Sequence, residues 1–234
     1  MEGTHQMMGY DRASTMFSPD GRLLQVEYAK EAVKQGSTAI GVVCKDGVIL
    51  VADKRVADKL IVAEAVEKIF QIDKHIGATA VGYIMDGRIL VERAQLISQQ
   101  HQITYSVPID TIALVKEISD IKQSYTQYGG ARPFGVSILF MGMDDEKAVL
   151  YVTEPTGIFF EYKAAVLGEG AEAVKEILYK EYSETMNMDD AIKMCLRALK
   201  KVLGKDFDAR RIDGAFVDVK DRNFQFIDKK KFKG

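Results

Sequence analysis

The chain has 234 residues and a mass of 26.1 kDa, with 47% apolar residues, 28% charged residues and only four prolines. This composition is typical of a packed protein and excludes a largely disordered chain. The 32 Lys and Arg residues oppose 34 Asp and Glu residues, which gives a formal net charge of −2. Because no excess of positive charge attracts nucleic acid or anionic lipid, we expect neither as a partner.

The cysteine and histidine residues indicate neither a disulfide framework nor a zinc site. Cys44 and Cys195 are far apart in the sequence, and His5, His75 and His101 are scattered without the spacing of a metal motif. Both cysteines fall in apolar segments and are interpreted as small core residues. We therefore expect no metal and no cofactor.

A leader peptide and a membrane span are not expected either. The N-terminus has no basic region followed by an apolar run, and no stretch approaches 18 uncharged apolar residues. A cytoplasmic location is the resulting expectation.

The N-terminal part of the chain is polar and irregular until a turn at residues 18–21, with the sequence SPDG. Proline fixes φ and glycine permits positive φ, so this turn predicts the start of a helix. The helix is expected over residues 22–35, where Lys30 interrupts a short apolar stripe. Two interpretations stay open: an ordinary amphipathic surface helix, or a helix whose packing partner is another subunit.

Blocks of strands and pairs of helices make up the rest of the chain, and the Asp46-Gly47 dipeptide marks the first hairpin. The predicted strands cover residues 38–44, 48–53, 68–72, 76–81, 135–141, 148–153, 158–162, 164–167, 212–219 and 224–227, and the predicted helices cover residues 86–102, 111–127, 171–182 and 188–203. This order lacks the strand and helix alternation of a parallel sheet. Two antiparallel sheets stacked between two helical layers satisfy it, in one α+β domain with an N-terminal extension.

Residues 168–173, with the sequence GEGAEA, fit a loose dinucleotide-binding fingerprint after an apolar run and before a helix. However, a second helix and not a parallel strand is predicted to follow. The favoured interpretation is that Gly168 and Gly170 ease a tight turn from strand to helix. A dinucleotide-dependent enzyme stays a distant alternative.

A second group of residues has the side-chain types that an activated nucleophile requires. Ser37 follows Gly36 at the head of a strand, Asp53 ends the neighbouring strand, and Lys68 follows. A lysine can accept the proton of a hydroxyl nucleophile or lower the pKa of that hydroxyl, and an aspartate can orient the lysine. From the residues alone, both a catalytic and a structural use of this constellation stay open.

Longer motifs carry a family resemblance. Residues 10–29 read YDRASTMFSPDGRLLQVEYA, and they are followed by GSTA at 36–39, YTQYGG at 125–130 and RPFGVS at 132–137. With these motifs the chain resembles the proteasome family over nearly its whole length, and within it the α-type subunits of archaeal core particles. The resemblance implies a four-layer αββα sandwich, the fold of N-terminal-nucleophile hydrolases. Residues 1–36 would form a gate segment and a pore-side helix, and residues 37–234 the sandwich.

For catalysis the resemblance implies a negative result. In the related β-type subunits the nucleophile is an N-terminal threonine whose own α-amine is the base. Ser37 stands at that position, with Asp53 and Lys68 at the assisting positions, but the nitrogen of an internal residue is a planar amide. General-base catalysis contributes on the order of 10²–10⁴-fold, so we expect a non-catalytic subunit. The alternative is a β-like peptidase activated by cleavage between Gly36 and Ser37.

The resemblance also implies three sets of functional residues. Outer rings of seven α subunits guard the entrance to the peptidase rings of β subunits, admit unfolded protein substrates and dock the C-terminal tails of activating ATPases. The implied gate residues are Tyr10, Asp11, Arg12, Pro19 and Tyr28. The implied activator-binding residues are Lys68, Gly82 and Lys30, with Tyr83 standing where many relatives carry leucine, and the implied pore constriction is Tyr128, Gly129 and Gly130.

Overall fold

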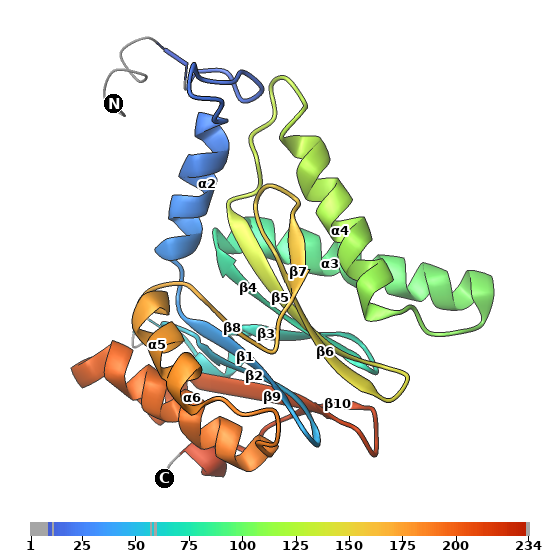
Figure 1. Ribbon diagram of the computed structural model, residues 1–234, viewed down its shortest axis with the longest axis vertical. Helices are drawn as coiled ribbons and strands as arrows, with labels where there is room; N and C mark the ends of the chain where they lie inside the picture. The colour runs from blue at the N-terminus through green and yellow to red at the C-terminus, as the bar shows by residue number, and fades with distance from the viewer. Residues whose placement is uncertain (1–8, 11, 57, 59, 233–234) are drawn as a thin grey trace.

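The computed structural model describes residues 9–10, 12–56, 58 and 60–232 (Figure 1). The described α-helices are α2 (Leu24–Lys34), α3 (Ile84–Tyr105), α4 (Thr111–Tyr125), α5 (Ala171–Glu181) and α6 (Met188–Leu203). The described strands are β1 (Ala39–Cys44), β2 (Gly47–Asp53), β3 (Ile69–Asp73), β4 (Ile76–Gly82), β5 (Val136–Asp144), β6 (Lys147–Thr153), β7 (Phe159–Glu161), β8 (Ala164–Leu167), β9 (Ile212–Asp218) and β10 (Phe224–Phe226). None of these helices is long and apolar enough to cross a membrane.

The strands form two five-stranded sheets with the orders β10-β9-β2-β1-β8 and β3-β4-β5-β6-β7. Every strand pairing within them is antiparallel. One apolar cluster, which includes Leu50 and Leu139, lies between the sheets. A second cluster packs α5 and α6 on the first sheet, and a third packs α3 and α4 on the other. The αββα sandwich expected from the sequence is thus confirmed.

The predicted strands and helices agree with the structure to within a few residues. The expected core role of Cys44 and Cys195 is also confirmed, since both are buried in the cluster under α5 and α6. Short 3₁₀ segments such as Ala63–Ala65 and Lys229–Phe232 were not predicted. The last of these carries exposed lysines but buries Phe232 against β9, because Gly214 leaves room for its ring.

Helix α2 stands apart from the two helical layers. It buries Leu24, Val26, Ala29 and Val33. Figure 1 shows α2 rising from one end of the sandwich, with the N-terminal segment above it and the loop from α4 to β5 reaching the same end. The loop comprises residues 126–135 and is called the α4–β5 loop below. This end of the molecule therefore brings together segments from the start and the middle of the chain.

Candidate functional site

Ser37, the predicted nucleophile position, lies within a chain segment that is held on both sides. The Gly36 N–H donates to the Val33 carbonyl at 3.0 Å, and the Gly36 carbonyl accepts from the Glu169 N–H at 2.8 Å. A Cβ at Gly36 would lie 2.6 Å from the Gly82 nitrogen. The peptide before Ser37 is therefore packed into the end of the sandwich, and its nitrogen is an amide without basicity.

Asp53 ends β2 and its side chain is fully buried. The Arg211 guanidinium grips it with two hydrogen bonds, Nε to Oδ1 and Nη2 to Oδ2, both 2.7 Å long. The Arg55 N–H also donates to Oδ1 at 3.1 Å. Hydrogen bonding to Asp53 raises the pKa of Arg211. Because both oxygens of Asp53 are engaged by arginines, the carboxylate has a structural role here.

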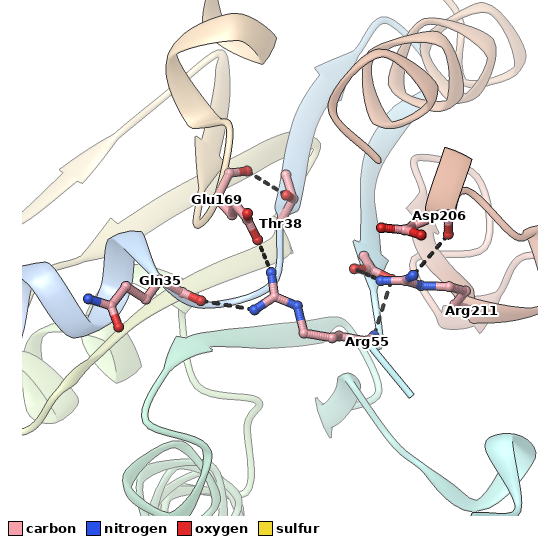
Figure 2. Close-up of polar contacts among 7 residues, drawn as sticks. Gln35, Thr38, Arg55, Glu169, Asp206 and Arg211 are labelled. Atoms are coloured by element: carbon pink, nitrogen blue, oxygen red, sulfur yellow. Dashed lines mark hydrogen bonds and ion pairs between the residues drawn. The ribbon is translucent and has the colours of Figure 1, made fainter. Parts of the chain in front are cut away.

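Arg55 is a neighbour of this site that no sequence motif indicated (Figure 2). Its backbone φ is +46°, in the left-handed region that non-glycine residues rarely adopt. The guanidinium donates to the Gln35 carbonyl at 3.1 Å and pairs with the Glu169 carboxylate. The Glu169 carbonyl in turn accepts from the Thr38 hydroxyl at 2.6 Å. Arg55 thereby links the end of α2 to the turn before α5. This link crosses the place where a catalytic subunit would need a free N-terminus.

Lys68 immediately precedes β3 and is only 8% exposed. Its Nζ donates to the Ala80 carbonyl at 2.7 Å, and its own carbonyl accepts from the Thr79 hydroxyl at 2.8 Å. Burial lowers the pKa of Lys68 to about 8, with nearby Asp53 opposing this shift. Lys68 therefore lies beside the end of β4 as a buried amine close to its ionisation point.

Gly82, the last residue of β4, lies two residues beyond the carbonyl that Lys68 contacts. Its φ is +125°, and a Cβ built on it would lie 2.2 Å from the Gly135 carbonyl oxygen. The resemblance implied glycine here because a side chain would fill a pocket. The structure adds a reason within the chain itself, which is the close approach of two backbones.

Lys30 does not join Lys68 and Gly82 within one chain. Its Nζ lies 3.9 Å from carboxylate oxygens of Glu27 and Glu154. It lines a groove of about 680 Å³ between α2, β8 and α5, and neither Lys68 nor Gly82 lines this groove. The structure thus unites two of the three predicted activator-binding residues and separates the third.

The predicted gate residues lie on the N-terminal segment before and within α2. Asp11 lies outside the described residues. In the turn at Pro19, the Gly21 N–H donates to the Ser18 carbonyl at 2.8 Å, as the sequence predicted. Pro19 and Tyr28 are exposed, and the Arg12 side chain packs on Gly9.

The α4–β5 loop projects next to this segment. Tyr128 is 67% exposed, and a Cβ at Gly129 or Gly130 would have no atom within 4 Å. The Ser14 hydroxyl donates to the Tyr128 carbonyl at 3.4 Å. The segment that carries the predicted gate residues therefore touches the loop that carries the predicted constriction.

The dinucleotide alternative is wrong. β8, which precedes Gly168, pairs antiparallel with β1, and α5 is followed by α6, so the required βαβ unit is missing from this part of the fold. Gly168 and Gly170 have φ values of +95° and +69°. Both glycines serve the turn from strand to helix.

Two family models match consecutive parts of the chain. Residues 33–217 match the model of the proteasome subunit, and residues 10–32 match the N-terminal signature of A-type proteasome subunits. The chain belongs to the proteasome α-subunit family. It is 50% identical over 218 residues to the proteasome α subunit of Methanosarcina acetivorans, covering 93% of this chain and 88% of that protein. It is 50% identical to the Archaeoglobus fulgidus α subunit, covering 97% and 92%, and 47% identical to the Methanocaldococcus jannaschii α subunit, covering 93% and 83%.

As a member of this family, the α subunit is of the non-catalytic type and assembles with other proteasome subunits. Its role in protein degradation is structural and gating, which agrees with the expectation from the sequence. The hydrogen bonds of Arg211 to Asp53 and those of the peptide before Ser37 agree with a non-catalytic subunit. The alternative of a β-like peptidase is therefore not supported.

The sequence did not indicate three residues that lie around Ser37 and Asp53. They are Arg55, Glu169 and Arg211. The Arg55–Glu169 and Arg211–Asp53 pairs join residues more than a hundred positions apart in the chain. No motif spacing reports such pairs. The GEG motif that contains Glu169 was visible in the sequence, but its contact with Arg55 was not.

Proposed function

We propose that the α subunit forms a seven-membered outer ring that gates substrate entry to the proteolytic chamber of the β subunits and docks activating ATPases. The observation that carries this proposal is the contact between Ser14 and Tyr128. It links the N-terminal segment to the exposed α4–β5 loop at one end of the molecule. A surface segment that opens locally at low free-energy cost can be displaced, as a gate requires.

In this proposal Tyr10, Asp11, Arg12, Pro19 and Tyr28 hold the gate segment, and Tyr128, Gly129 and Gly130 narrow the pore behind it. The tyrosine side chain supplies bulk. Because a Cβ at either glycine would have no atom within 4 Å, seven copies of the loop can approach one another closely in a narrow ring. Residues 1–36 then act as gate segment and pore-side helix, and residues 37–234 as the sandwich that carries them.

Lys68 and Gly82 form the proposed docking pocket for the terminal carboxylate of an ATPase tail. An ammonium group binds a carboxylate through a charge-assisted hydrogen bond. Lys30 lies elsewhere on the same chain, so it contributes to such a pocket only from a neighbouring copy. A pocket at the boundary between copies accounts for both positions.

Exposed apolar side chains support the assembly with other subunits. The second half of α3 and the following turn expose Ile103, Tyr105 and Val107 by 81%, 65% and 52%. Exposing such a projecting apolar tip to water does not stabilise a monomer. We assign this tip and the exposed residues 60–62 to contacts with other subunits.

Removal of residues 2–12 tests the gate. In core particles assembled with a β subunit, we expect the deletion to raise unstimulated hydrolysis of a short peptide, because the pore is no longer obstructed. A particle carrying Lys193→Ala, an exposed change on α6, serves as the control. An unchanged basal rate in the deletion particle, with assembly verified by electron microscopy, would contradict the gate.

A further inference from the structure

The α4–β5 loop is positioned from its base. Its tip has open space around Gly129 and Gly130. At the base, the rings of Tyr125 and Phe134 pack with their centroids 4.6 Å apart. Arg132 lies between Gly130 and Phe134 in the sequence, so whatever holds Arg132 fixes the base of the loop.

Asp86, in the first turn of α3, holds Arg132. Arg132 Nη1 donates to Asp86 Oδ2 at 2.6 Å, and Nη2 donates to Oδ1 at 2.7 Å. The Gly135 N–H donates to Oδ2 at 2.8 Å. The Asp86 side chain is only 10% exposed. Burial opposes its ionisation, but the bonds from Arg132 and Gly135 outweigh burial and lower the pKa of Asp86, so it is a carboxylate at neutral pH.

The same few residues form the edge of the proposed docking pocket. The Tyr83 N–H donates to the Gly135 carbonyl at 2.8 Å, and Gly82 packs against that carbonyl. The Arg132 guanidinium lies 5.2 Å from the centre of the Tyr83 ring. On the other side, a Cβ at Gly135 would lie 3.7 Å from the Ala32 Cβ of α2. The pocket edge, the base of the loop and α2 therefore meet around one buried carboxylate.

We propose that the Asp86–Arg132 ion pair transmits occupation of the Lys68–Gly82 pocket to the α4–β5 loop. This rests on the proposed function, because it requires an activator carboxylate that binds Lys68. Such a carboxylate takes Lys68 Nζ away from the Ala80 carbonyl, and the end of β4 shifts together with β5, to which Gly82 is paired through Val136. Because Gly82 and Gly135 are in close backbone contact, a shift of Gly82 moves Gly135. Asp86 and Arg132 then carry the shift to the loop and act as positioning residues for the gate.

The test uses core particles assembled from the full α chain and a β subunit. The probe is a synthetic peptide with a free C-terminal carboxylate, with its amidated twin as the negative control, and the readout is hydrolysis of a fluorogenic substrate. Asp86→Asn and Arg132→Gln should each lower the maximum stimulation at least about fivefold, the lower end of ordinary coupling factors, while the half-saturating peptide concentration stays within about twofold. Both substitutions remove the same interaction. The maximum stimulation of the double variant should therefore be no lower than that of the more impaired single variant.

Two further variants keep the test decisive. Arg132→Lys, which retains the charge without the two-pronged geometry, should restore part of the stimulation. Arg88→Gln, in the exposed pair of Arg88 with Glu92 on the same helix, should stimulate like the parent. If Asp86→Asn does not assemble, Arg132→Gln and Arg132→Lys still decide.

The outcomes separate this proposal from the proposed function. If Lys68→Ala loses stimulation but the Asp86 and Arg132 variants keep the parental maximum, the coupling is wrong and the docking pocket stands. A parallel fall of maximum and peptide affinity would show that the pair merely shapes the pocket, which also overturns the coupling. Full stimulation of the Lys68→Ala particle would instead remove the pocket itself.

Discussion

Arg211 binds Asp53 through two parallel hydrogen bonds of 2.7 Å, although the two residues are 158 positions apart in the sequence. From the sequence we expected Asp53 at the position of the aspartate that assists catalysis in the related peptidase subunits. In the structure the carboxylate joins the end of β2 to the segment before β9 and is part of the structural framework.

Arg211→Ala should destabilise the α subunit strongly. Among the described residues, removing the guanidinium leaves the Arg55 N–H as the hydrogen-bond donor to the fully buried Asp53 carboxylate. Breaking a buried pair on one side costs about 3–5 kcal/mol of unfolding free energy. Denaturant unfolding of the purified protein measures this loss. Arg210→Ala is the matched control, because the Arg210 side chain is 81% exposed and pairs with Asp208 at the surface. Equal losses in the two variants would argue against the role assigned to Arg211.

Gly82→Ala should also destabilise the fold. Its Cβ would lie 2.2 Å from the Gly135 carbonyl, at a φ of +125° that alanine rarely adopts. Backbone strain and overpacking of this kind cost roughly 1–3 kcal/mol each. Gly129→Ala provides the control, since its Cβ would meet open space, and we expect a change within about 0.5 kcal/mol. Comparable melting temperatures for the parent and Gly82→Ala would contradict the close contact.

Ser37→Ala should leave peptide hydrolysis by the assembled core particle unchanged. The Ser37 nitrogen is an amide and the Asp53 carboxylate is held by Arg211, so the hydroxyl has no free amine base. Turnover numbers of parental and variant particles, with equal β subunit content, provide the measurement. Loss of turnover on this substitution, or a mature chain that begins at Ser37, would place catalysis in this subunit.

Lys68→Ala should abolish most of the stimulation by an activating ATPase while rings still assemble. A hydrogen bond between charged groups contributes about 1.5–3 kcal/mol, so docking should weaken roughly 10- to 150-fold. Degradation of an unfolded substrate, with and without the ATPase, measures the loss. Lys193→Ala, whose side chain is 68% exposed on α6, is the control. Unchanged stimulation in the Lys68 variant would exclude this residue from the pocket.

Docking at Lys68 should depend on pH. Its pKa is lowered to about 8, so the binding ammonium form prevails below pH 8 and is lost as the pH rises above it. The half-saturating concentration of a carboxylate-terminated peptide should therefore increase from pH 7 to pH 9. In Lys68→Arg the guanidinium stays charged over this range, so the dependence should disappear. The same pH dependence in both particles would point to another group.

Much of the fold was predictable because strand and helix periodicities are local properties of the chain. The limits of β8 and α6 agreed with the prediction, and an antiparallel sandwich satisfied the order of elements, although that order alone did not select it. The order of strands within each sheet was less accessible, because β9 inserts beside β2 through contacts between distant residues. The burial of Phe232 was not predicted for the same reason, since a lysine-rich terminus gives no local signal of a core residue.

The sequence alone determined the lineage of the chain and the state of Ser37, because covalent connectivity makes the nitrogen of an internal residue an amide whatever the fold. Only the tertiary structure decided that Asp53 is bound by Arg211, that Lys68 is buried on the Ala80 carbonyl, and that Lys30 lies on a different surface. These facts depend on which distant segments pack together. Partner choice, burial and pKa are properties of that packing and leave no trace in residue spacing.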